Sequence, residues 1–510
     1  MSQATPSNIR ASRPQTPAGF LWFLGSATVL SGLVPLGIVA AIPVVANAPW
    51  GLPMIILVIA GVGVSARIAS GDPSIMQFIV WLFSYLFFGV APTINLRAGT
   101  YPSTTPGVEI SLVAPATGIV LLGLLCFEVG AWLGRRRRRK STGSDKATIV
   151  VVRDVATTRL AVLSVAGLAL AVYYVYQVGV STLFESRAAL SYARSNTLST
   201  SPLAAIVASL AWIPLLVSAH GWFQLSRAAH IRGNSALKRR ARLFGWVSAI
   251  LVLAVENPIG NARYTAGTAY SSFLGPLGGF VNRTRTRISY LVIFLGLVIV
   301  FPNADAFRRS INPVFQTGGL FDGFLGNGDY DAFWTLQNAI AYVQTNGITW
   351  GNQLLGAVLF WVPRTWWPAK PVDSGILLAN FRGYQFTNLS APLWAEFIIN
   401  FGPVGVIAGF LIVGWLCQRI DAAASLAFIR GGHAAVLGAI LPFYLTILLR
   451  GSLLQAAGSL VVLLISWSFI RGSGEPATEA AAANGLSTKA IDDLHRLHRR
   501  RTPPEDSIRS

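Results

Sequence analysis

The sequence has little charge, few histidines and only two cysteines. Of its 510 residues, 12% are charged and 53% are hydrophobic, whereas a soluble globular chain carries roughly a quarter charged residues. This composition excludes a secreted soluble enzyme and a disordered protein. Two cysteines cannot form a disulfide framework, and with five scattered histidines they offer no metal site. Glycine-rich nucleotide motifs are also absent, so we expect no cofactor.

Long apolar runs predict an all-α polytopic integral membrane protein with about 12 transmembrane helices, within a range of about 10–13. The runs of spanning length lie at about residues 20–42, 51–66, 75–93, 109–134, 160–178, 203–225, 243–256, 265–281, 289–302, 394–417, 433–449 and 452–470. Because the first run is long enough to remain as an anchor, we expect no cleavable signal peptide.

These runs divide the chain into five parts. Residues 1–19 form a cytoplasmic N-terminal segment, and residues 20–302 hold helices 1–9 with basic cytoplasmic loops. Residues 303–393 form one large extracytoplasmic loop domain. Residues 394–470 hold helices 10–12, and residues 471–510 form a basic cytoplasmic tail whose composition indicates disorder.

The basic residues indicate how the helices are oriented. With both termini in the cytoplasm, most of the 40 lysines and arginines fall on the cytoplasmic side, as the positive-inside rule requires. The net charge of +20 is therefore mostly a consequence of topology. The run from Arg135 to Lys140 directly follows an apolar span and is typical of a stop-transfer anchor on anionic lipid. We expect contact with membrane lipids and none with nucleic acid.

The extracytoplasmic loop is the expected place for chemistry, because loops longer than about fifteen residues in compact proteins are usually functional. Its opposite charges almost cancel, and turn signals bracket a helix-like stretch. From Asp331 onward, apolar residues repeat at helical spacing at Phe333, Leu336, Ile340 and Val343. The apolar run at residues 354–362 is too short to span a bilayer, which predicts an interfacial or re-entrant segment.

Residues 360–371 combine two cations with prolines and tryptophans. Prolines fix φ and lower the entropy lost on ordering, so Arg364 and Lys370 can be held in place. Arginine forks onto phosphate oxygens and lysine adds a point charge, which suits a pyrophosphate at headgroup depth. Tryptophans such as Trp367 stack on sugars or cations. An aromatic belt with two snorkelling cations explains the same residues equally well.

Three further arginines lie in external turns. Residues 256–264 form a hinge broken by proline and glycine, which places Arg263 near the membrane surface but inside the protein envelope. Arg187 and Arg194 lie in the loop at about residues 179–202. Each of the three suits an anionic substrate, and each also fits a residue that merely flanks a membrane span.

Glu396 and Asn400 lie four residues apart at the start of the tenth predicted span, and therefore on one helix face. A carboxylate in a membrane helix is costly unless paired, so Glu396 is either the partner of an arginine or a general base whose pKa is raised by burial. The alternative is an acid that simply favours a helix N-terminus. We interpret Glu128, the other intramembrane acid, as structural.

Taken together, these segments resemble the Wzy-type O-antigen polymerases, the oligosaccharide repeat-unit polymerases of bacterial envelopes. The span pattern covers most of the chain, and the most specific part runs from about Asp329 to Gly405. The residues that carry the resemblance are Asp329-Tyr330-Asp331-Ala332-Phe333, Val362-Pro363-Arg364, Trp367-Pro368-Ala369-Lys370-Pro371, Ser374-Gly375, Ala395-Glu396, Asn400-Phe401-Gly402 and Gly405, with Asn257-Pro258 and Arg263 as a shorter upstream motif.

The resemblance implies a metal-independent glycosyltransferase of GT-C-like architecture in the bacterial inner membrane. Such enzymes move a growing glycan from an undecaprenyl-pyrophosphate carrier onto another lipid-linked repeat unit at the outer face of the membrane. The partners implied are this lipid-linked oligosaccharide, a flippase and a chain-length regulator.

The resemblance also implies roles for the residues singled out above. The charge that develops on the pyrophosphate leaving group must be neutralised, and cations would do this where the sequence offers no metal site. A carboxylate would deprotonate the acceptor hydroxyl. Either Glu396 or Asp331 fits that role, although Asp331 also fits a cap of the loop helix. The substrate-binding residues implied are Arg364, Lys370, Arg263, Arg187, Trp367 and Asn400.

Two other functions fit the same chain. An O-antigen ligase shares the lipid carrier and the loop arginines but donates to a lipid or protein acceptor. A lipid-linked oligosaccharide flippase or transporter would also have about twelve spans, but transporters tend to show internal repeats and polar residues at the midplane. Here no repeat relates the two halves, and the polar residues gather in one loop, which favours the enzyme.

Overall fold

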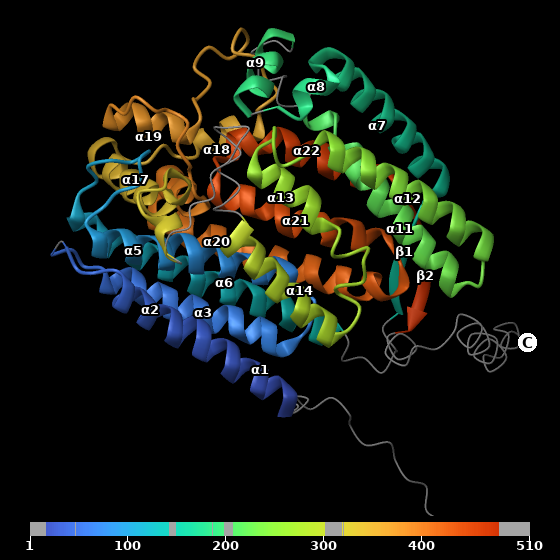
Figure 1. Cartoon of the computed structure of the whole chain (residues 1–510), viewed down its shortest axis with the longest axis horizontal. Coiled ribbons are helices and arrows are strands. Elements are labelled where there is room, and N and C mark those ends of the chain that lie inside the picture. Colours follow the sequence, from blue (N-terminus) through green and yellow to red (C-terminus); the bar gives the residue numbers. More distant parts are fainter. Residues whose placement is uncertain are drawn as a thin grey trace, which may run out of the picture.

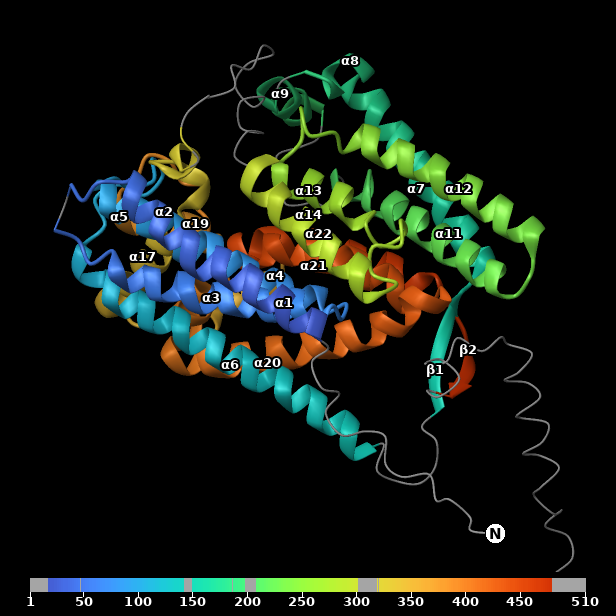
Figure 2. The ribbon, with the colours of Figure 1, turned by 60° about the horizontal axis from the view of Figure 1, so that its bottom comes forward.

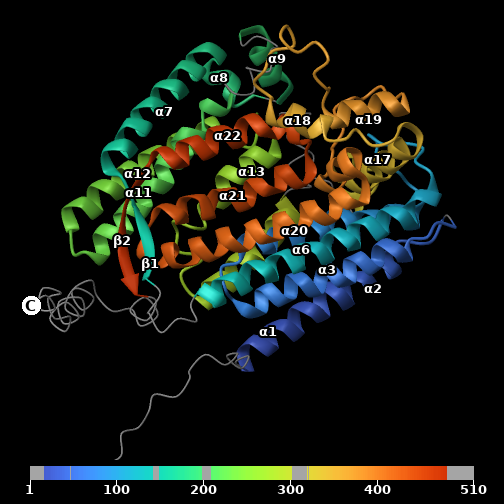
Figure 3. The same ribbon diagram turned by 180° about the vertical axis from the view of Figure 1, so that it is seen from behind.

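The computed structural model describes residues 17–45, 47–141, 149–185, 187–197, 208–300, 319 and 321–478. These residues are mostly helical, and seven of their helices are long and apolar enough to cross a membrane. The chain is therefore a helical membrane protein, seen from opposite sides in Figures 1 and 3. The predicted segment up to residue 16, loop residues 303–318 and 320, and the tail beyond residue 478 lie outside the described residues.

The candidate spans fall into two blocks of the sequence, one in its first third and one near its end. The first span joins α1 (Pro17–Ala27), η1 (Thr28–Leu33) and α2 (Val34–Ala41). The others are α3 (Gly51–Ser70), α4 with η2 and α5 (Ile75–Phe83, Ser84–Val90, Ala91–Ala98), η3 with α6 (Ile110–Leu112, Val113–Ser141), α7 (Thr157–Val178), α20 (Leu393–Arg430) and α21 (His433–Arg450).

The remaining described helices are shorter or more polar. Between the two blocks lie α8 (Val180–Leu183), α9 (Arg187–Thr197), α11 (Ile213–Ile231), α12 (Ser235–Val255), α13 (Arg263–Ser272), α14 (Arg283–Leu295) and η4 (Gly296–Val300). The loop region contains η5 (Asp322–Phe324), η6 (Gly328–Tyr330), α17 (Ala332–Asn346), α18 (Asn352–Val358) and α19 (Ser374–Arg382), and α22 (Leu453–Phe469) follows α21.

The predicted span at residues 265–281 is not a continuous helix. The run at residues 265–281 is helical only as far as Ser272, where α13 ends and turns follow. Pro276 lacks a backbone donor, and Gly278 has a φ of 84°, a left-handed conformation that ends regular helix. Apolar composition alone overestimates the helix there, and the total of twelve spans stays a prediction.

The long helices pack around α20 and α21. α20 lies along α6, and Figures 1 and 3 both show the two side by side. Glycine allows this close approach, because a Cβ on Gly414 of α20 would lie 2.0 Å from the carbonyl oxygen of Phe127 in α6. Small residues at such contacts are typical of membrane helices. α21 in turn packs on α4 and α13.

The described structure is not wholly α-helical. Strand β1 (Ile149–Val155) pairs antiparallel with β2 (Arg471–Thr478). The expectation that disorder begins at residue 471 is therefore wrong for the eight residues of β2. The β-branched run in β1 explains the pairing, because such residues favour strands. Figure 2 shows these strands at one end of the molecule and α17 and α19 at the other, which we call the sheet end and the loop end.

Two acids toward the sheet end of the helices have structural partners. Asp421 of α20 accepts a hydrogen bond from the N–H of Met76 at 2.9 Å and so caps α4 from a distant helix. Glu128 pairs with Arg67 and accepts a hydrogen bond from Trp81 Nε1 at 2.8 Å. An intramembrane acid that is paired in this way stabilises the bundle, which agrees with the structural interpretation of Glu128.

Candidate functional site

The loop residues from 321 to 393 fold as short helices at the loop end of the bundle. α17 begins directly after Asp331, as the helical spacing predicted, and it packs on α20, α6 and α19. α18 has seven residues, too few to span a bilayer, and it packs on α20 and α22. These elements bring distant segments of the chain against the loop-end termini of α13, α20 and α21.

The first group of side chains there contains two arginines and two aspartates. We call Arg263, Asp329, Asp331 and Arg450 the Arg–Asp cluster. Arg263 forms a hydrogen-bonded ion pair with Asp329. Nη2 of Arg450 lies 3.4 Å from Asp331 Oδ1 and 3.9 Å from Asp329 Oδ1, and Nε donates to the Asp329 carbonyl oxygen at 3.1 Å. The opposite charges compensate one another for the hydration lost on burial.

Asp331 is almost fully buried, with 1% of its surface exposed. It stands at the start of α17, but its side chain makes no cap hydrogen bond to that helix. Instead, Oδ2 accepts hydrogen bonds from Thr104 Oγ1 at 3.2 Å and from the N–H of Ser390 at 3.4 Å, while Oδ1 faces Arg450. The interpretation of Asp331 as a helix cap is therefore wrong.

A second group, which we call the Glu–Ser cluster, contains Glu396, Ser374, Asp373 and Ser452. Glu396 lies in the first turn of α20. Its Oε2 accepts a hydrogen bond from Ser374 Oγ at 2.9 Å, and its Oε1 accepts one from the N–H of Leu453 at 2.9 Å. Both donors are uncharged, so Glu396 is held here by neutral partners rather than by the arginine that the sequence suggested as one alternative.

Asp373 directly precedes Ser374 and is buried with it. Its carboxylate accepts a hydrogen bond from the Ser452 hydroxyl and caps α19 through the N–H of Gly375 at 2.8 Å. Burial raises the pKa of Asp373 above its usual value, even though these hydrogen bonds favour the ionised form. The Glu–Ser cluster therefore includes a carboxyl group that is harder to ionise than one in water.

One turn joins the two clusters. Arg450 ends α21 and Leu453 begins α22, with Gly451 and Ser452 between them. The Arg450 side chain enters the Arg–Asp cluster. Two residues later, the Ser452 hydroxyl and the N–H of Leu453 donate to the carboxylates of the Glu–Ser cluster. The turn from Arg450 to Leu453 therefore holds both groups of acids in one region.

Arg364 and Lys370 bind the backbone of their own segment. Arg364 donates to the carbonyl oxygens of Lys370 at 2.6 Å and Pro371 at 3.1 Å. Lys370 Nζ donates to the carbonyl oxygens of Phe360 at 2.7 Å and Val362 at 2.9 Å, and burial lowers the pKa of this ammonium. These hydrogen bonds cross-link the segment and do not reach either cluster.

Asn400 attaches the loop to α20. Its Oδ1 accepts a hydrogen bond from the N–H of Leu354 at 3.0 Å, and its Nδ2 donates to the Glu396 carbonyl oxygen at 2.8 Å. The helix breaks just beyond, at Gly402, where φ is 64°. The break leaves carbonyl oxygens without helical partners, and that of residue 399 accepts the N–H of Thr349 at 2.8 Å.

The other two predicted binding residues are Arg187 and Trp367. Arg187 is half-buried at the start of α9, and Trp367 is half-buried within residues 360–371. Arg194 of α9 contacts the segment that leads into Arg263, because its Nη2 donates to Asn261 Oδ1 at 2.6 Å.

The sequence does not single out Arg450 or Ser452. Between two apolar runs, Arg450 resembles an ordinary flanking cation. The signal that identifies it is the shortness of the turn, since only Gly451 and Ser452 separate α21 from α22. A turn this short keeps the arginine close to the helix ends, so its charge is expected to pair with an acid inside the protein.

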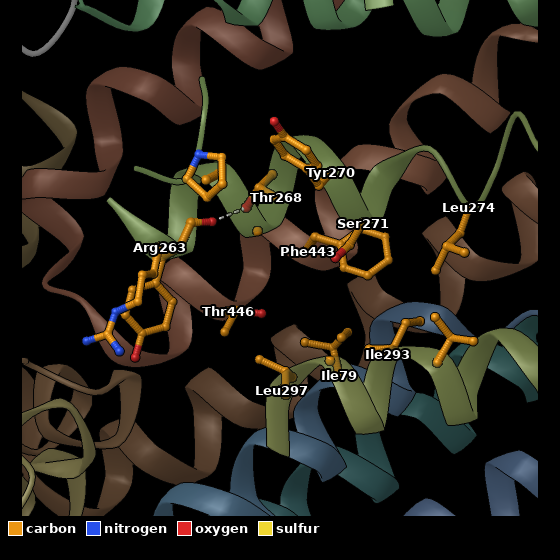
Figure 4. A pocket seen from close by; sticks show the side chains of 16 residues that line it. Ile79, Arg263, Thr268, Tyr270, Ser271, Leu274, Ile293, Leu297, Phe443 and Thr446 are labelled. Atoms are coloured by element: carbon orange, nitrogen blue, oxygen red, sulfur yellow. Dashed lines mark hydrogen bonds between the residues drawn. The ribbon is translucent and has the colours of Figure 1, made fainter. Parts of the chain in front are cut away.

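An apolar cavity of about 400 Å³ adjoins the Arg–Asp cluster. It lies between α13, α14 with η4, α4 and α21, and Figure 4 shows Arg263 at one end and Leu274 at the other. Its volume falls within the range of about 300–1,000 Å³ that is typical of ligand sites.

The groups that the loop end brings together are carboxylates, hydroxyls and guanidinium groups, which can accept protons and neutralise an anion. Within the part of the chain that the structure describes, no three His, Cys, Asp or Glu side chains are grouped so as to hold a metal ion. Comparisons of the chain with protein-family models, with curated proteins and with solved structures found no match.

Proposed function

We propose that this membrane protein is an O-antigen-like polysaccharide polymerase. It would transfer a growing glycan from an undecaprenyl-pyrophosphate carrier onto another lipid-linked repeat unit. The proposal rests on one observation. Segments that carry the resemblance to this family, at residues 263, 329–331, 374 and 396, are far apart in the sequence but meet around the turn from Arg450 to Leu453.

The chemistry of the two clusters suits this reaction. The acceptor hydroxyl oxygen bonds to the anomeric carbon of the donor sugar, the bond from that carbon to the pyrophosphate oxygen breaks, and the hydroxyl proton passes to a carboxylate. A carboxylate held by an arginine is a poorer proton acceptor than one held by neutral donors. We therefore assign the base to Glu396, with Asp331 as a positioning residue that holds Arg450.

Arg263 and Arg450 are the cations that we assign to the departing pyrophosphate, since both lie in the Arg–Asp cluster. Each faces an aspartate, so a pyrophosphate would compete with Asp329 or Asp331 for them. Arg364, Lys370 and Asn400 are better explained as residues that hold the loop in place, because their hydrogen bonds tie loop segments together. Trp367 stays a predicted substrate contact.

The proposal includes the setting of the enzyme. We infer a GT-C-like protein of about 12 spans in the bacterial inner membrane, with both termini in the cytoplasm and the loop end at the outer face. Basic residues near the strands support this orientation, because Arg153 lies in β1, Arg159 donates to the Arg471 carbonyl oxygen and Arg232 pairs with Asp154. A flippase and a chain-length regulator would be its partners.

The test is polymer formation by purified protein in liposomes supplied with a lipid-pyrophosphate-linked repeat unit. The wild type should produce a ladder of glycan lengths. Glu396→Gln should reduce its rate at least about 100-fold, which is the contribution typical of a general base. Glu109→Gln is the matched control, because Glu109 is a carboxylate at the loop end that pairs with Arg382 and belongs to neither cluster.

The outcomes separate the candidate functions. A ladder that persists in Glu396→Gln would remove the base assignment. Transfer of a finished glycan to an acceptor other than a repeat unit, without a ladder, would indicate the ligase. Net movement of the lipid-linked glycan across the bilayer without any transfer would indicate the flippase.

A further inference from the structure

The apolar cavity beside the Arg–Asp cluster has the features of a lipid-chain site. Its walls are mainly aliphatic and aromatic side chains, among them Ile79, Leu274, Ile293 and Phe443 (Figure 4). An apolar cavity of this kind has no affinity for water and favours apolar ligands. The expected occupant is therefore a hydrocarbon.

Two of the polar side chains in the wall are already satisfied by the protein. Thr268 Oγ1 donates to the carbonyl oxygen of Tyr264 at 2.8 Å within α13, and the Tyr270 hydroxyl donates to the Leu253 carbonyl oxygen at 3.0 Å. Both hydroxyl groups thus have partners in the protein. They do not require a polar ligand group.

The cavity is open at its side. Of the residues that line it, Tyr270 is 43% exposed and Val292 is 50% exposed, and Gly267 is also exposed. Ile288, Leu295 and Ile299 continue the exposed apolar surface along α14 and η4. In a membrane protein such a surface faces lipid, so a chain can enter the cavity sideways between α13 and α14.

The end of the cavity near the loop end carries two arginines, which face the aspartates of the Arg–Asp cluster. Arg263 lines it there, and Arg450 lies beside it with its guanidinium carbon 5.0 Å from the centre of the Tyr264 ring, which also lines the cavity. A hydrocarbon with a phosphate at one end matches this combination of an apolar wall and arginine at one terminus.

We propose that the cavity holds the head-proximal part of the polyprenyl chain of the phosphate carrier, with its phosphate groups at Arg263 and Arg450. This inference rests on the proposed function, which requires such a carrier. A cavity of this volume holds only the chain nearest the head. The rest of a long polyprenyl chain would pass through the lateral opening into the bilayer.

The cavity can be filled without disturbing its walls. A Cβ on Gly267 or on Gly296, which both line the cavity, would meet no atom within 4 Å. Gly267→Leu and Gly296→Leu should therefore fold normally and occupy the space of the chain. Gly118→Leu in α6 is the matched control. A Cβ on Gly118 also meets no atom within 4 Å, and Gly118 is exposed but does not line the cavity.

The experiment uses the full chain in liposomes and a polyprenyl phosphate with a photoreactive group in its first isoprene units. Labelled peptides are identified by mass spectrometry. We expect labelling in α4, α13, α14 with η4, and α21. Labelling should fall at least tenfold in Gly267→Leu and Gly296→Leu and should not change in Gly118→Leu. Unlabelled undecaprenyl phosphate should compete with the probe, whereas phosphatidylglycerol at the same concentration should not.

Labelling outside these helices, or unchanged labelling in both cavity variants, would overturn the inference. Equal competition by phosphatidylglycerol would also overturn it and would identify the cavity as a site for bulk lipid. Failure of the polymerase proposal can be told apart from failure of the cavity assignment. In that case the wild type makes no glycan ladder, while photolabelling of the cavity is as expected. Equally, a wild-type ladder that persists in both cavity variants would overturn the cavity assignment alone.

Discussion

Replacing Arg450 with methionine tests whether the Arg–Asp cluster is a buried ionic network. The Arg450 side chain is 19% exposed and that of Asp331 is 1% exposed, so the change leaves a carboxylate without its cation in a site that is largely closed to water. Removing one partner of a buried pair costs about 3–5 kcal/mol. Because Asp331 keeps its hydrogen bonds from Thr104 and Ser390, we expect the lower end of that range, about 3 kcal/mol, in the free energy of unfolding.

The measurement is reversible denaturation in mixed micelles, completed as a double-mutant cycle with Asp331→Asn. The double variant removes both charges, so its loss of stability should be smaller than the sum of the two single losses by at least about 1 kcal/mol. Arg283→Met is the control. Its partner Asp72 lies at 3.9 Å and is 67% exposed, so this change should cost less than about 1 kcal/mol. Single losses that add to within about 0.5 kcal/mol would refute the buried pairing of Arg450 with Asp331.

Three further changes test other parts of the structure. Asn400→Ala removes the acceptor of the Leu354 N–H and should cost about 1–3 kcal/mol, with faster proteolysis of the neighbouring loop; unchanged cleavage would contradict the anchoring role. Burial raises the pKa of Asp373 above 3.8, so the folded state keeps a proton that the unfolded state has released. The free energy of unfolding should therefore fall as pH rises from about 3.8 through the folded-state pKa, and Asp373→Asn should remove that fall. The same dependence of the free energy of unfolding on pH in wild type and variant would exclude a raised pKa of Asp373. Gly414→Leu pushes a side chain into the Phe127 carbonyl oxygen and should cost at least about 1–3 kcal/mol in thermal unfolding, whereas equal stability of this variant and Gly118→Leu would argue against the close α6–α20 contact.

Local regularities in the sequence predict two features of the loop end. Helical spacing from Asp331 identifies α17. The four-residue spacing of Glu396 and Asn400 places them on one face, and Asn400 Nδ2 accordingly donates to the Glu396 carbonyl oxygen. Both features depend on residues within one or two helical turns. Such short-range patterns follow directly from the geometry of the helix.

The site itself depends on contacts that no local pattern reveals. Arg450 meets Asp331 across a separation of 119 residues, and neither segment contains a feature that indicates the other. Arg364 and Lys370 look like substrate cations because they stand between prolines. In the folded chain their side chains donate hydrogen bonds to backbone carbonyl oxygens of the same segment. Such carbonyl oxygens would be bonded by backbone N–H groups in a regular helix. The same composition thus serves either role, and only the tertiary fold decides between them.

The short connection between α21 and α22 makes the loop end sensitive to chain length. The Arg450 side chain is fixed by the helix before the turn, whereas the Leu453 N–H that binds Glu396 is fixed by the helix after it. One extra residue after Gly451 adds up to about 3.5 Å of chain, more than a hydrogen bond tolerates. A single-residue insertion there would separate the Arg–Asp cluster from the Glu–Ser cluster while leaving every side chain of both intact. The length of this turn therefore fixes the distance between the two clusters. An insertion can change that distance without changing any side chain of the site.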